Sequence, residues 1–381
     1  MEQTKLLTSV PATIMRGGTS KGVFIKRCDF PEWDDRARRD QIILALMGTP
    51  DPMQIDGLGG THSSTSKLVV VAAASQPDLD LEYTFVQVGI DAPVVDYMGN
   101  CGNLTAAVAP FGLFEELVAG VEPVTKIALW NTNTQKRIIA EVPFGRSVVE
   151  QGDFQIDGVP HPGAPIVIHF LEPGGTSTGK LLPTGRTQDV VPTSRGKFEV
   201  SIVDVTNPVV FVRASALGLE GIELPSSLNA DRTLLEGLAE IRCRAAVLAG
   251  IHADEEQAGR SNVPSIAVVG PPQDYVTATG RTIRAADLDL VARIVSMGRV
   301  HHAYQGTGAM CTTAATQLQG TIPYQVAGGG SQKQVVLGHP KGLFTAEVEV
   351  EAIESGGQNL TKISVTRTAR RLMRGMAYAH C

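Results

Sequence analysis

Short stretches of apolar residues recur along this chain, some continuous and some alternating with polar residues, with glycine, proline or asparagine between them. Such stretches predict β-strands joined by turns. The clearest is Leu68-Val-Val-Val-Ala-Ala73, a continuous run typical of a buried strand. In the first half the predicted strands cover 10–14, 22–26, 68–73, 80–88, 94–97, 125–131, 136–142, 153–156 and 166–170. In the second half they cover 198–205, 208–213, 266–269, 334–337, 343–352 and 362–368, and residues 372–379 are expected to cross back to the first half.

The period of an α-helix appears at a few places between these strands. Residues 34–47 pass from charged to apolar and end at Gly48 and Pro50, which predicts an amphipathic helix with a sharp stop. Residues 104–113 predict a buried helix that contains Pro110. Further helices are predicted over 229–249 and 287–297, and an Ala- and Thr-rich helix follows Gly306-Thr-Gly308.

The second half repeats the design of the first. Residues 300–315 resemble the region around Cys101 in pattern: a strand, a glycine-rich turn and a helix of small residues. We therefore expect an α+β fold of two similar domains, 1–184 and 185–368, each with strands wrapped around one central helix, with the tail 369–381 joining the first domain. The N-termini of the two helices are expected to face each other across a cleft, where ligands commonly bind.

Composition narrows the class of protein. The chain has 381 residues, 43% of them hydrophobic, and a net charge of −6, without a long basic run, so a nucleic-acid partner is not expected. Its 5 cysteines are odd in number and irregularly spaced, which indicates a reducing compartment. No signal-peptide pattern or membrane-spanning apolar run is visible, so we expect a cytoplasmic protein that does not bind membranes. The sequence does not specify the oligomeric state, and a homodimer is our working expectation.

The most informative stretch is Met98-Gly-Asn-Cys-Gly-Asn-Leu-Thr105, in which Cys101 stands between two Gly/Asn pairs. Glycine and asparagine favour a tight turn here, and Asn100 or Asn103 is predicted to cap the helix that follows. Backbone N–H groups and the positive end of the helix dipole would then surround the thiol, which lowers a thiol pKa and favours bound carboxylates. The ordinary alternative is a small buried cysteine in a turn.

Two other stretches carry polar groups suited to an anion. Met15-Arg-Gly-Gly-Thr-Ser-Lys21 is a glycine-rich turn in which Arg16, Thr19 and Ser20 could grip a carboxylate, although a plain β-hairpin explains the pattern equally well. Gly57-Leu-Gly-Gly-Thr-His-Ser-Ser-Thr-Ser-Lys67 leads into an apolar strand. A partly desolvated Lys67 would be a usable base near neutral pH, whereas a lysine that snorkels from a strand end is the alternative.

Other motifs are weaker. Ser64-Thr-Ser-Lys67 fits the Ser-x-x-Lys pattern of serine acyl-enzymes but lacks its partner motifs. Gly174-Gly-Thr-Ser-Thr-Gly-Lys180 is close to a phosphate-binding loop, but Leu181 replaces the magnesium ligand, so we interpret it as a flexible connector. The histidines lack metal-ligand spacing, although His62 could line a site with Lys67. We expect neither a metal nor an organic cofactor.

Taken together, Met15-Arg-Gly-Gly-Thr-Ser-Lys-Gly22, Ser63-Ser-Thr-Ser-Lys67, Gly99-Asn-Cys-Gly-Asn103, Asp204 with Asn207-Pro208, and Gly306-Thr-Gly308 resemble the PrpF family. That family includes 2-methylaconitate cis-trans isomerases, 4-oxalomesaconate tautomerases and methylitaconate or aconitate delta-isomerases. The resemblance covers nearly the whole chain. It implies a diaminopimelate-epimerase-like fold, two domains that are each a β-barrel-like sheet around a central helix, with the active site between them.

The resemblance also implies cofactor-independent proton transfer on a small unsaturated di- or tricarboxylate. The family's catalytic lysine and cysteine match Lys67 and Cys101. The implied substrate-binding residues lie in the glycine-rich turns: Arg16, Gly17, Thr19, Ser20, Ser64, Ser66, Asn100, Gly102, Asn103, Gly306, Thr307 and Gly308. Racemases of this fold carry a second catalytic cysteine where this chain has Gln305, and Cys311 comes too late, inside the following helix.

The mechanism we expect is removal of an allylic proton by one member of the Lys67–Cys101 pair and reprotonation by the other, giving a 1,3-shift or a cis-trans isomerisation. The sequence does not decide which residue is the base. An amino-acid racemase of the same fold and a non-catalytic tricarboxylate-binding protein stay open as alternatives.

Overall fold

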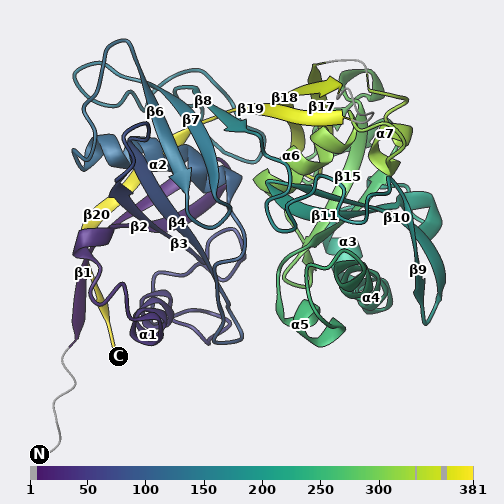
Figure 1. Cartoon of the computed structure of the whole chain (residues 1–381), viewed down its shortest axis with the longest axis horizontal. Helices are drawn as coiled ribbons and strands as arrows, with labels where there is room; N and C mark the ends of the chain where they lie inside the picture. The colour runs from purple at the N-terminus through teal and green to yellow at the C-terminus, as the bar shows by residue number, and fades with distance from the viewer. Residues whose placement is uncertain (1–6, 331–332, 353–357, 381) are drawn as a thin grey trace, which may run out of the picture. The chain divides into compact units, whose positions relative to one another are not determined.

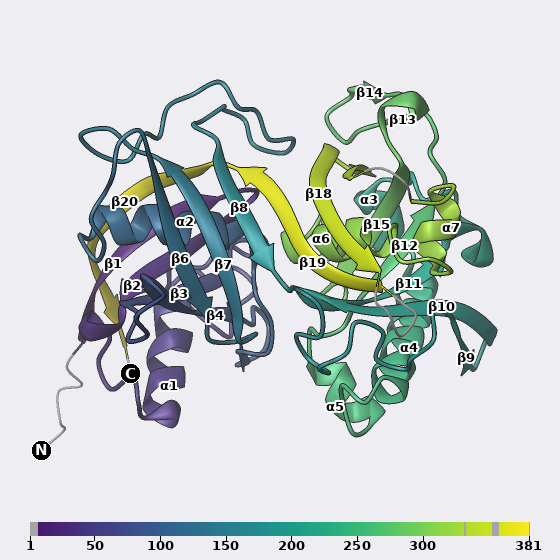
Figure 2. The ribbon, with the colours of Figure 1, turned by 45° about the horizontal axis from the view of Figure 1, so that its top comes forward.

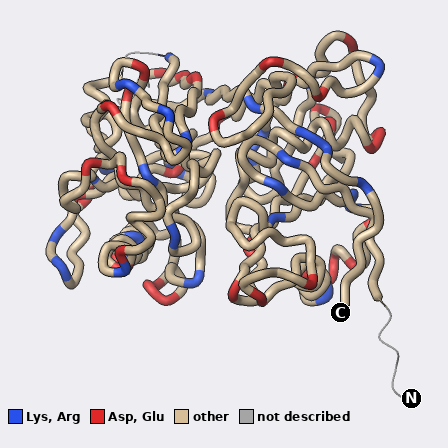
Figure 3. The backbone as a smooth tube through the Cα atoms, turned by 180° about the vertical axis from the view of Figure 1, so that it is seen from behind, with Lys and Arg blue, Asp and Glu red and all other residues tan. Residues whose placement is uncertain are grey.

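The structure is a computed structural model that describes residues 7–330, 333–352 and 358–380. The chain folds into two compact units, the first formed by Met1–Ile168 with Arg367–Cys381 and the second by His169–Thr366. Figure 1 follows the chain from the purple N-terminus to the yellow C-terminal strand, which lies among strands of the first unit. Lysine and arginine alternate with aspartate and glutamate over both units (Figure 3). No helix within the described residues combines the length and the apolarity needed to cross a membrane.

The first unit is a sheet curved around one buried helix, α2 (Gly102–Phe114), with α1 (Arg36–Met47) on the opposite face of the sheet (Figure 1). Asp35 caps the start of α1 through Oδ1, and Gly48 ends that helix in the left-handed conformation, as the sequence predicted. The strands are β1 (Thr8–Gly17), β2 (Ser20–Lys26), β3 (Lys67–Ala73), β4 (Leu81–Val88), β5 (Val95–Asp96), β6 (Val124–Asn131), β7 (Lys136–Pro143), β8 (Ile166–Leu171) and β20 (Ala369–Ala379).

The second unit has the same plan, with α6 (Gly306–Ala315) as its buried helix and α4 (Arg232–Leu248) on the opposite face of the strands. Its strands are β9 (Asp189–Thr193), β10 (Gly196–Val205), β11 (Asn207–Arg213), β12 (Ser265–Gly270), β13 (Tyr275–Val276), β14 (Thr282–Ile283), β15 (Leu290–Ser296), β16 (Arg299–Val300), β17 (Gln334–His339), β18 (Gly342–Ala352) and β19 (Gln358–Arg367). The smaller helices are α3 (Pro225–Ala230), α5 (Glu255–Arg260) and α7 (Ile322–Val326).

Strand pairing shows that the two units repeat one topology. In the first, β1 and β2 form a hairpin, β2 runs parallel to β3, β3 antiparallel to β4, and β4 parallel to β6. In the second, β10, β11, β12, β15 and β17 pair in the same order and senses. One more strand completes each sheet: β20, from the C-terminal end of the chain, pairs with β1 (Figure 2), and β9, which directly precedes β10, pairs with β10. The predicted crossing of the tail back to the first half is therefore confirmed.

Both central helices owe their burial to small side chains. Residues 102–113 are buried throughout α2, and the whole of α6 is buried as well. Gly, Ala and Thr dominate both segments, so the surrounding strands can approach the helix closely. Apolar residues on the other face of the strands pack beneath α1 and α4; Leu68 belongs to the first of these clusters and Ile266 to the second.

Two predicted elements are wrong. The helix predicted over 287–297 is β15, because Leu290–Ser296 is a β-branched run buried on every residue, and periodicity does not separate a buried strand from a buried helix. The helix predicted over 229–249 is confirmed as α4, which begins at Arg232 because Asp231 ends α3 and caps α4 through a bond from Leu234 N. No strand forms over 153–156, where the structure has only an isolated bridge between Phe154 and Gly163.

The chain passes from the first unit to the second within β8 and returns at the end of β19. Our predicted boundaries were 184/185 and 368/369, whereas the units divide at 168/169 and 366/367. The difference arises mainly from residues 169–184, which are fixed to the second unit: Glu172 N bonds to Thr361 O at 2.8 Å, and Gly175 N bonds to Asp204 O at 2.8 Å.

Candidate active site

Lys67 is the first residue of β3, and its side chain is buried, with 8% of the residue exposed. Nζ donates to Oε1 of Gln87, the facing residue on β4, at 2.5 Å and lies 5.0 Å from the centre of the Phe85 ring. Among the described residues, no carboxylate lies within ion-pair distance of this ammonium. Burial lowers the pKa of Lys67, and an ionised Cys101 thiol nearby raises that pKa in opposition. The expectation of a desolvated lysine therefore agrees with the structure.

Cys101 occupies the N-cap position of α2, with extended backbone dihedrals and 7% of the residue exposed. The prediction that Asn100 or Asn103 caps this helix is wrong. The Asn100 side chain turns back to accept the Cys101 N–H at 2.7 Å, and Asn103 lies inside the first turn. Within the described part of the chain no side chain caps α2, so N–H groups of its first turn have no intrahelical partner beside the thiol. Sγ lies 3.8 Å from Oγ of Ser20.

The glycine-rich turn at Met15–Lys21 is the tip of the β1–β2 hairpin, with Gly17 paired to Ser20. Its glycines allow the hairpin to contact α2 directly: a Cβ on Gly17 would lie 2.4 Å from the carbonyl oxygen of Asn103. Asn103 Nδ2 also donates to Thr19 Oγ1 at 3.0 Å. The hairpin interpretation is thus correct, and the same contacts hold Thr19 and Ser20 at the N-terminus of α2.

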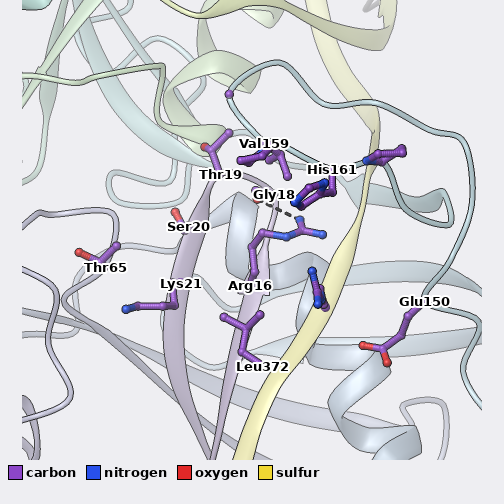
Figure 4. Close-up of a pocket in the computed structure, with 14 residues that line it drawn as sticks. Arg16, Gly18, Thr19, Ser20, Lys21, Thr65, Glu150, Val159, His161 and Leu372 are labelled. Atoms are coloured by element: carbon purple, nitrogen blue, oxygen red, sulfur yellow. Dashed lines mark hydrogen bonds between the residues drawn. The ribbon is translucent and has the colours of Figure 1, made fainter.

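Arg16 lies near the end of β1 with its guanidinium half-buried. Nη1 donates to the carbonyl oxygens of Gly18 at 3.1 Å and Thr368 at 2.8 Å, so part of its hydrogen-bonding capacity holds the hairpin tip against the returning chain. Burial, and then repulsion from Arg370, lowers the Arg16 pKa, while Glu150 opposes that change. Figure 4 shows the Arg16 side chain directed into a cavity of about 310 Å³ beside His161.

Some predicted site residues have structural partners instead. Ser66 is fully buried, and its Oγ accepts from Gln54 Nε2 at 2.8 Å. Ser64 Oγ lies 3.1 Å from Nδ1 of His62, which pairs these two side chains with each other. Lys67 begins a strand and Ser64 begins no helix, so the arrangement of a Ser-x-x-Lys acyl-enzyme is absent from this segment. Asn100 bonds within the unit to Tyr83 and Thr105.

Gly306, Thr307 and Gly308 form the first turn of α6, whereas the sequence predicted a turn that precedes the helix; the second unit holds them through its own hairpin. Thr206 Oγ1 donates to the Thr307 carbonyl oxygen at 3.0 Å, and Asn207 Nδ2 donates to Thr307 Oγ1 at 3.2 Å. This contact between a hairpin tip and the first turn of a central helix repeats the contact of Thr19 with Asn103.

The second unit has neutral groups at the positions that correspond to Lys67 and Cys101. Ser265 precedes Ile266 in β12 as Lys67 precedes Leu68 in β3, and Gln305 is the N-cap of α6 as Cys101 is that of α2. Ser265 Oγ donates to Gln305 Oε1 at 2.9 Å. Cys311 lies within α6 and is fully buried, where desolvation raises its pKa. Gln305 therefore precedes the first turn of α6, and Cys311 lies inside that helix, as expected from the sequence.

The segment that resembles a phosphate-binding loop is not a flexible connector. Backbone N–H groups of Thr176, Ser177 and Thr178, with both threonine hydroxyls, donate to the carboxylate of Asp204 at 2.6 to 3.1 Å. Asp204 is fully buried near the end of β10. The loop thus binds an anion, as its composition suggests, but the anion is a carboxylate of the same chain.

Sequence reasoning missed several residues at this site. Gln87 and Phe85 surround Lys67, and a glutamine within the otherwise apolar end of β4 was the available signal. Glu150, His161 and Arg370 line the cavity beside Arg16, and they come from a loop and from the C-terminal strand. The pairing of β20 with β1 brings the C-terminal strand to the hairpin, and no local sequence motif predicts this pairing.

Each unit has the same strand order around a buried helix, which defines the fold of the proline racemases and epimerases. The structure superposes on a hydroxyproline epimerase from Agrobacterium vitis with a TM-score of 0.56 at 13% identity, covering 100% of this chain and 95% of the other. Likeness at that level concerns the fold alone. The predicted fold class, two similar α+β domains of the epimerase type, is confirmed.

A family model described as PrpF protein matches residues 7–380, and the chain belongs to this family. It is 44% identical to 3-methylitaconate isomerase of Eubacterium barkeri, over 97% of each chain, and 40% identical to 2-methyl-aconitate isomerase of Shewanella oneidensis, over 96% of each. It is 35% identical to 4-oxalomesaconate tautomerase of Pseudomonas putida, over 97% of this chain and 96% of the other. A crystal structure of methylitaconate-delta-isomerase superposes with a TM-score of 0.79 at 43% identity, covering 98% of this chain and 96% of the other. These relatives confirm the predicted family and the predicted class of enzyme, an isomerase.

Proposed function

We propose that the protein moves an allylic proton in small unsaturated di- or tricarboxylates, with Lys67 and Cys101 as the acid–base pair. The observation that carries this proposal is a buried lysine that has no carboxylate partner among the described residues and that interacts electrostatically with a cysteine at the N-cap of α2. The substrates named for the relatives, methylitaconate, 2-methylaconitate and 4-oxalomesaconate, share an alkene conjugated to a carboxylate or able to become so.

The chemistry needs a base that is neutral near pH 7, because an allylic C–H is a weak acid. Burial of Lys67 favours the neutral amine, which can take the proton onto Nζ. The electron pair left on carbon delocalises through the alkene onto the carboxylate as a dienolate. Cys101 then donates its thiol proton to the far carbon, or to the same carbon after bond rotation, and the proton on Nζ returns to the thiolate before the next turnover.

Negative charge on the dienolate requires donors that are already in place. The uncapped first turn of α2 supplies backbone N–H groups and the positive end of a helix dipole. Thr19 and Ser20 lie at the same place because Gly17 lets the hairpin contact α2. In this proposal Arg16, Gly102 and Asn103 contribute to binding the substrate carboxylate, and Gly306–Gly308 contribute the donors of α6.

Proton exchange tests the proposal directly. We would incubate the protein with each candidate acid in D2O and follow proton NMR. Deuterium should enter an allylic position of at least one acid as a new isomer appears. Lys67→Ala and Cys101→Ala should each lower the rate about a hundredfold or more, the usual range for a general acid or base. The variants Lys126→Ala and Cys28→Ser serve as controls, because each removes the same kind of side chain at an exposed position.

Exchange in none of the acids would contradict the proposal and favour a binding protein. Exchange at the α-carbon of an amino acid would favour a racemase, for which Gln305 offers no thiol. Our remaining expectations, a cytoplasmic location and a homodimer, belong to the same proposal. Light scattering coupled to gel filtration tests the second, and a mass of one chain, 40.4 kDa, would contradict it.

A further inference from the structure

The cavity beside Arg16 extends the candidate site away from Lys67 and Cys101. It measures about 310 Å³ and lies within the first unit, between the hairpin tip, the loop that carries His161 and the strand β20 (Figure 4). Its wall combines cationic groups with apolar surface from Val159 and Leu372. A cavity of this composition suits a short carbon chain that ends in an anionic group.

The charges in this cavity do not cancel. Arg16, Lys21 and Arg370 line it, and within the part of the chain that the structure describes none of these side chains forms an ion pair. Glu150 is the carboxylate in the wall, and its Oε1 already accepts the backbone N–H of Arg371 at 2.7 Å. Burial lowers the Arg16 pKa, repulsion from Arg370 lowers it further, and Glu150 opposes both effects. A bound carboxylate would relieve that repulsion.

The cavity is joined to the acid–base pair through Ser20. This residue lines the cavity, and its Oγ lies 3.8 Å from Sγ of Cys101. A substrate branch that runs from carbons near Cys101 to Arg16 would therefore pass Ser20. Both Arg16 and Arg370 retain N–H donors there, because Arg16 uses only Nη1 in its bonds to backbone carbonyls and no side-chain bond of Arg370 exists within the described residues.

We propose that this cavity is a subsite for a carboxylate of the substrate remote from the reacting alkene, and that Arg370 is the residue that selects for it. The inference rests on the proposed function and narrows it: the preferred substrates carry a carboxymethyl branch, as tricarboxylates do, rather than a methyl group at the same position. Arg370 is exposed at the rim of the cavity, so its substitution removes the charge without disturbing the core.

Two saturated acids isolate this branch. Tricarballylate and methylsuccinate differ only by a carboxymethyl group in place of a methyl group, and neither has an alkene that can react. We would measure their dissociation constants by calorimetry on the wild-type protein, on Arg370→Gln and on Arg371→Gln. Arg371 is the matched control: it is the next residue of β20, it lies outside the cavity wall, and its guanidinium is over the Phe114 ring.

We expect the wild-type protein and Arg371→Gln to bind tricarballylate at least tenfold more tightly than methylsuccinate, and Arg370→Gln to lose most of that preference. Equal binding of the two acids by the wild-type protein, or the same loss in both variants, would overturn the proposal. Inorganic phosphate that displaces tricarballylate at equal concentration would show a general oxyanion site and would overturn it as well.

The outcomes separate this proposal from the proposed function. Without deuterium exchange in any acid, the proposed function fails while the two calorimetric constants still decide whether Arg370 selects a carboxylate. With exchange present and the preference unchanged in Arg370→Gln, the subsite fails alone. Circular dichroism of both variants verifies that each is folded.

Discussion

Lys67 and Gln87 face each other across β3 and β4, and the lysine ammonium donates to the glutamine amide oxygen at 2.5 Å. Gln87 is itself held by its Nε2, which donates to the carbonyl oxygens of Ser63 at 3.2 Å and Ser66 at 2.9 Å. These bonds fix which end of the amide points at Nζ. A neutral acceptor orients the lysine without supplying the negative charge that would keep it protonated.

Replacing that acceptor by a carboxylate should disable the base. In Gln87→Glu the new charge would raise the Lys67 pKa, so less of the lysine is neutral at pH 7 and the rising limb of the kcat/KM profile should move to higher pH. We expect a rate at least tenfold lower at pH 7, with recovery in alkaline buffer. Gln87→Leu is the control for lost orientation: it should lower the rate without the alkaline shift. A profile of Gln87→Glu that coincides with wild type would contradict Lys67 as the base.

The buried lysine should also cost the fold stability. Because burial lowers the folded-state pKa, the unfolded chain binds this proton more tightly than the folded chain at pH 7. Lys67→Met should therefore abolish activity while increasing the free energy of unfolding by about 1 kcal/mol. The gain should be largest below the folded-state pKa and should vanish as the pH rises past the ordinary lysine value. Denaturant unfolding at several pH values measures it, and a destabilised Lys67→Met would refute this account of the site.

Gly17 should be essential for the contact between the hairpin and α2. In Gly17→Ala the new Cβ would lie 2.4 Å from Asn103 O and 3.0 Å from Leu104 Cα, which are backbone atoms that cannot move alone. We expect a loss of about 1–3 kcal/mol of stability and a clear loss of activity, because Thr19 and Ser20 move with the hairpin. Gly145→Ala, which meets no atom within 4 Å, is the matched control and should change neither quantity. Thermal unfolding of both variants measures the change in stability, and their rates of deuterium exchange into substrate measure the change in activity.

Asp204 should be among the most sensitive residues of the second unit. Asp204→Asn replaces one carboxylate oxygen, which accepts from Thr176 or Thr178, with an NH2 group that cannot accept, and so leaves buried donors unsatisfied. We expect a loss of about 2 kcal/mol or more in the free energy of unfolding. The same substitution at the exposed N-cap Asp231 should be nearly neutral, since asparagine caps a helix as well as aspartate does. Equal effects of the two substitutions would contradict the structural role of Asp204.

The sequence predicted the parts of this molecule that depend on local chemistry. Gly48 ended a helix, the turn at Gly18 joined two strands, and a helix of small residues followed Cys101, because each depends on conformations that a few neighbouring residues decide. Family resemblance then singled out Lys67 and Cys101. Periodicity failed at Leu290–Ser296, where burial on both faces removes the polar positions that separate strand from helix.

Other parts of the site depend on contacts between distant segments. Gln87 is 20 residues from Lys67 and meets it only through the register of β3 on β4. Arg370 reaches the cavity of Arg16 because β20 pairs with β1, a relation that spans almost the whole chain. The predicted caps Asn100 and Asn103 show the reverse: local propensity favoured them, but each amide is used by tertiary contacts with Tyr83 or Thr19.

The pair Ser265 and Gln305 provides a test of whether acid–base catalysis resides in one unit. These residues occupy the places of Lys67 and Cys101 within the second unit, but they have no group that titrates between pH 5 and 10. Gln305→Ala should therefore change KM more than kcat, with the pH profile unchanged in shape and kcat reduced less than tenfold. Cys101→Ala should instead lose about a hundredfold or more in kcat. Steady-state kinetics of the two variants over pH makes the comparison, and a titrating limb lost in Gln305→Ala would show that the second unit takes part in proton transfer.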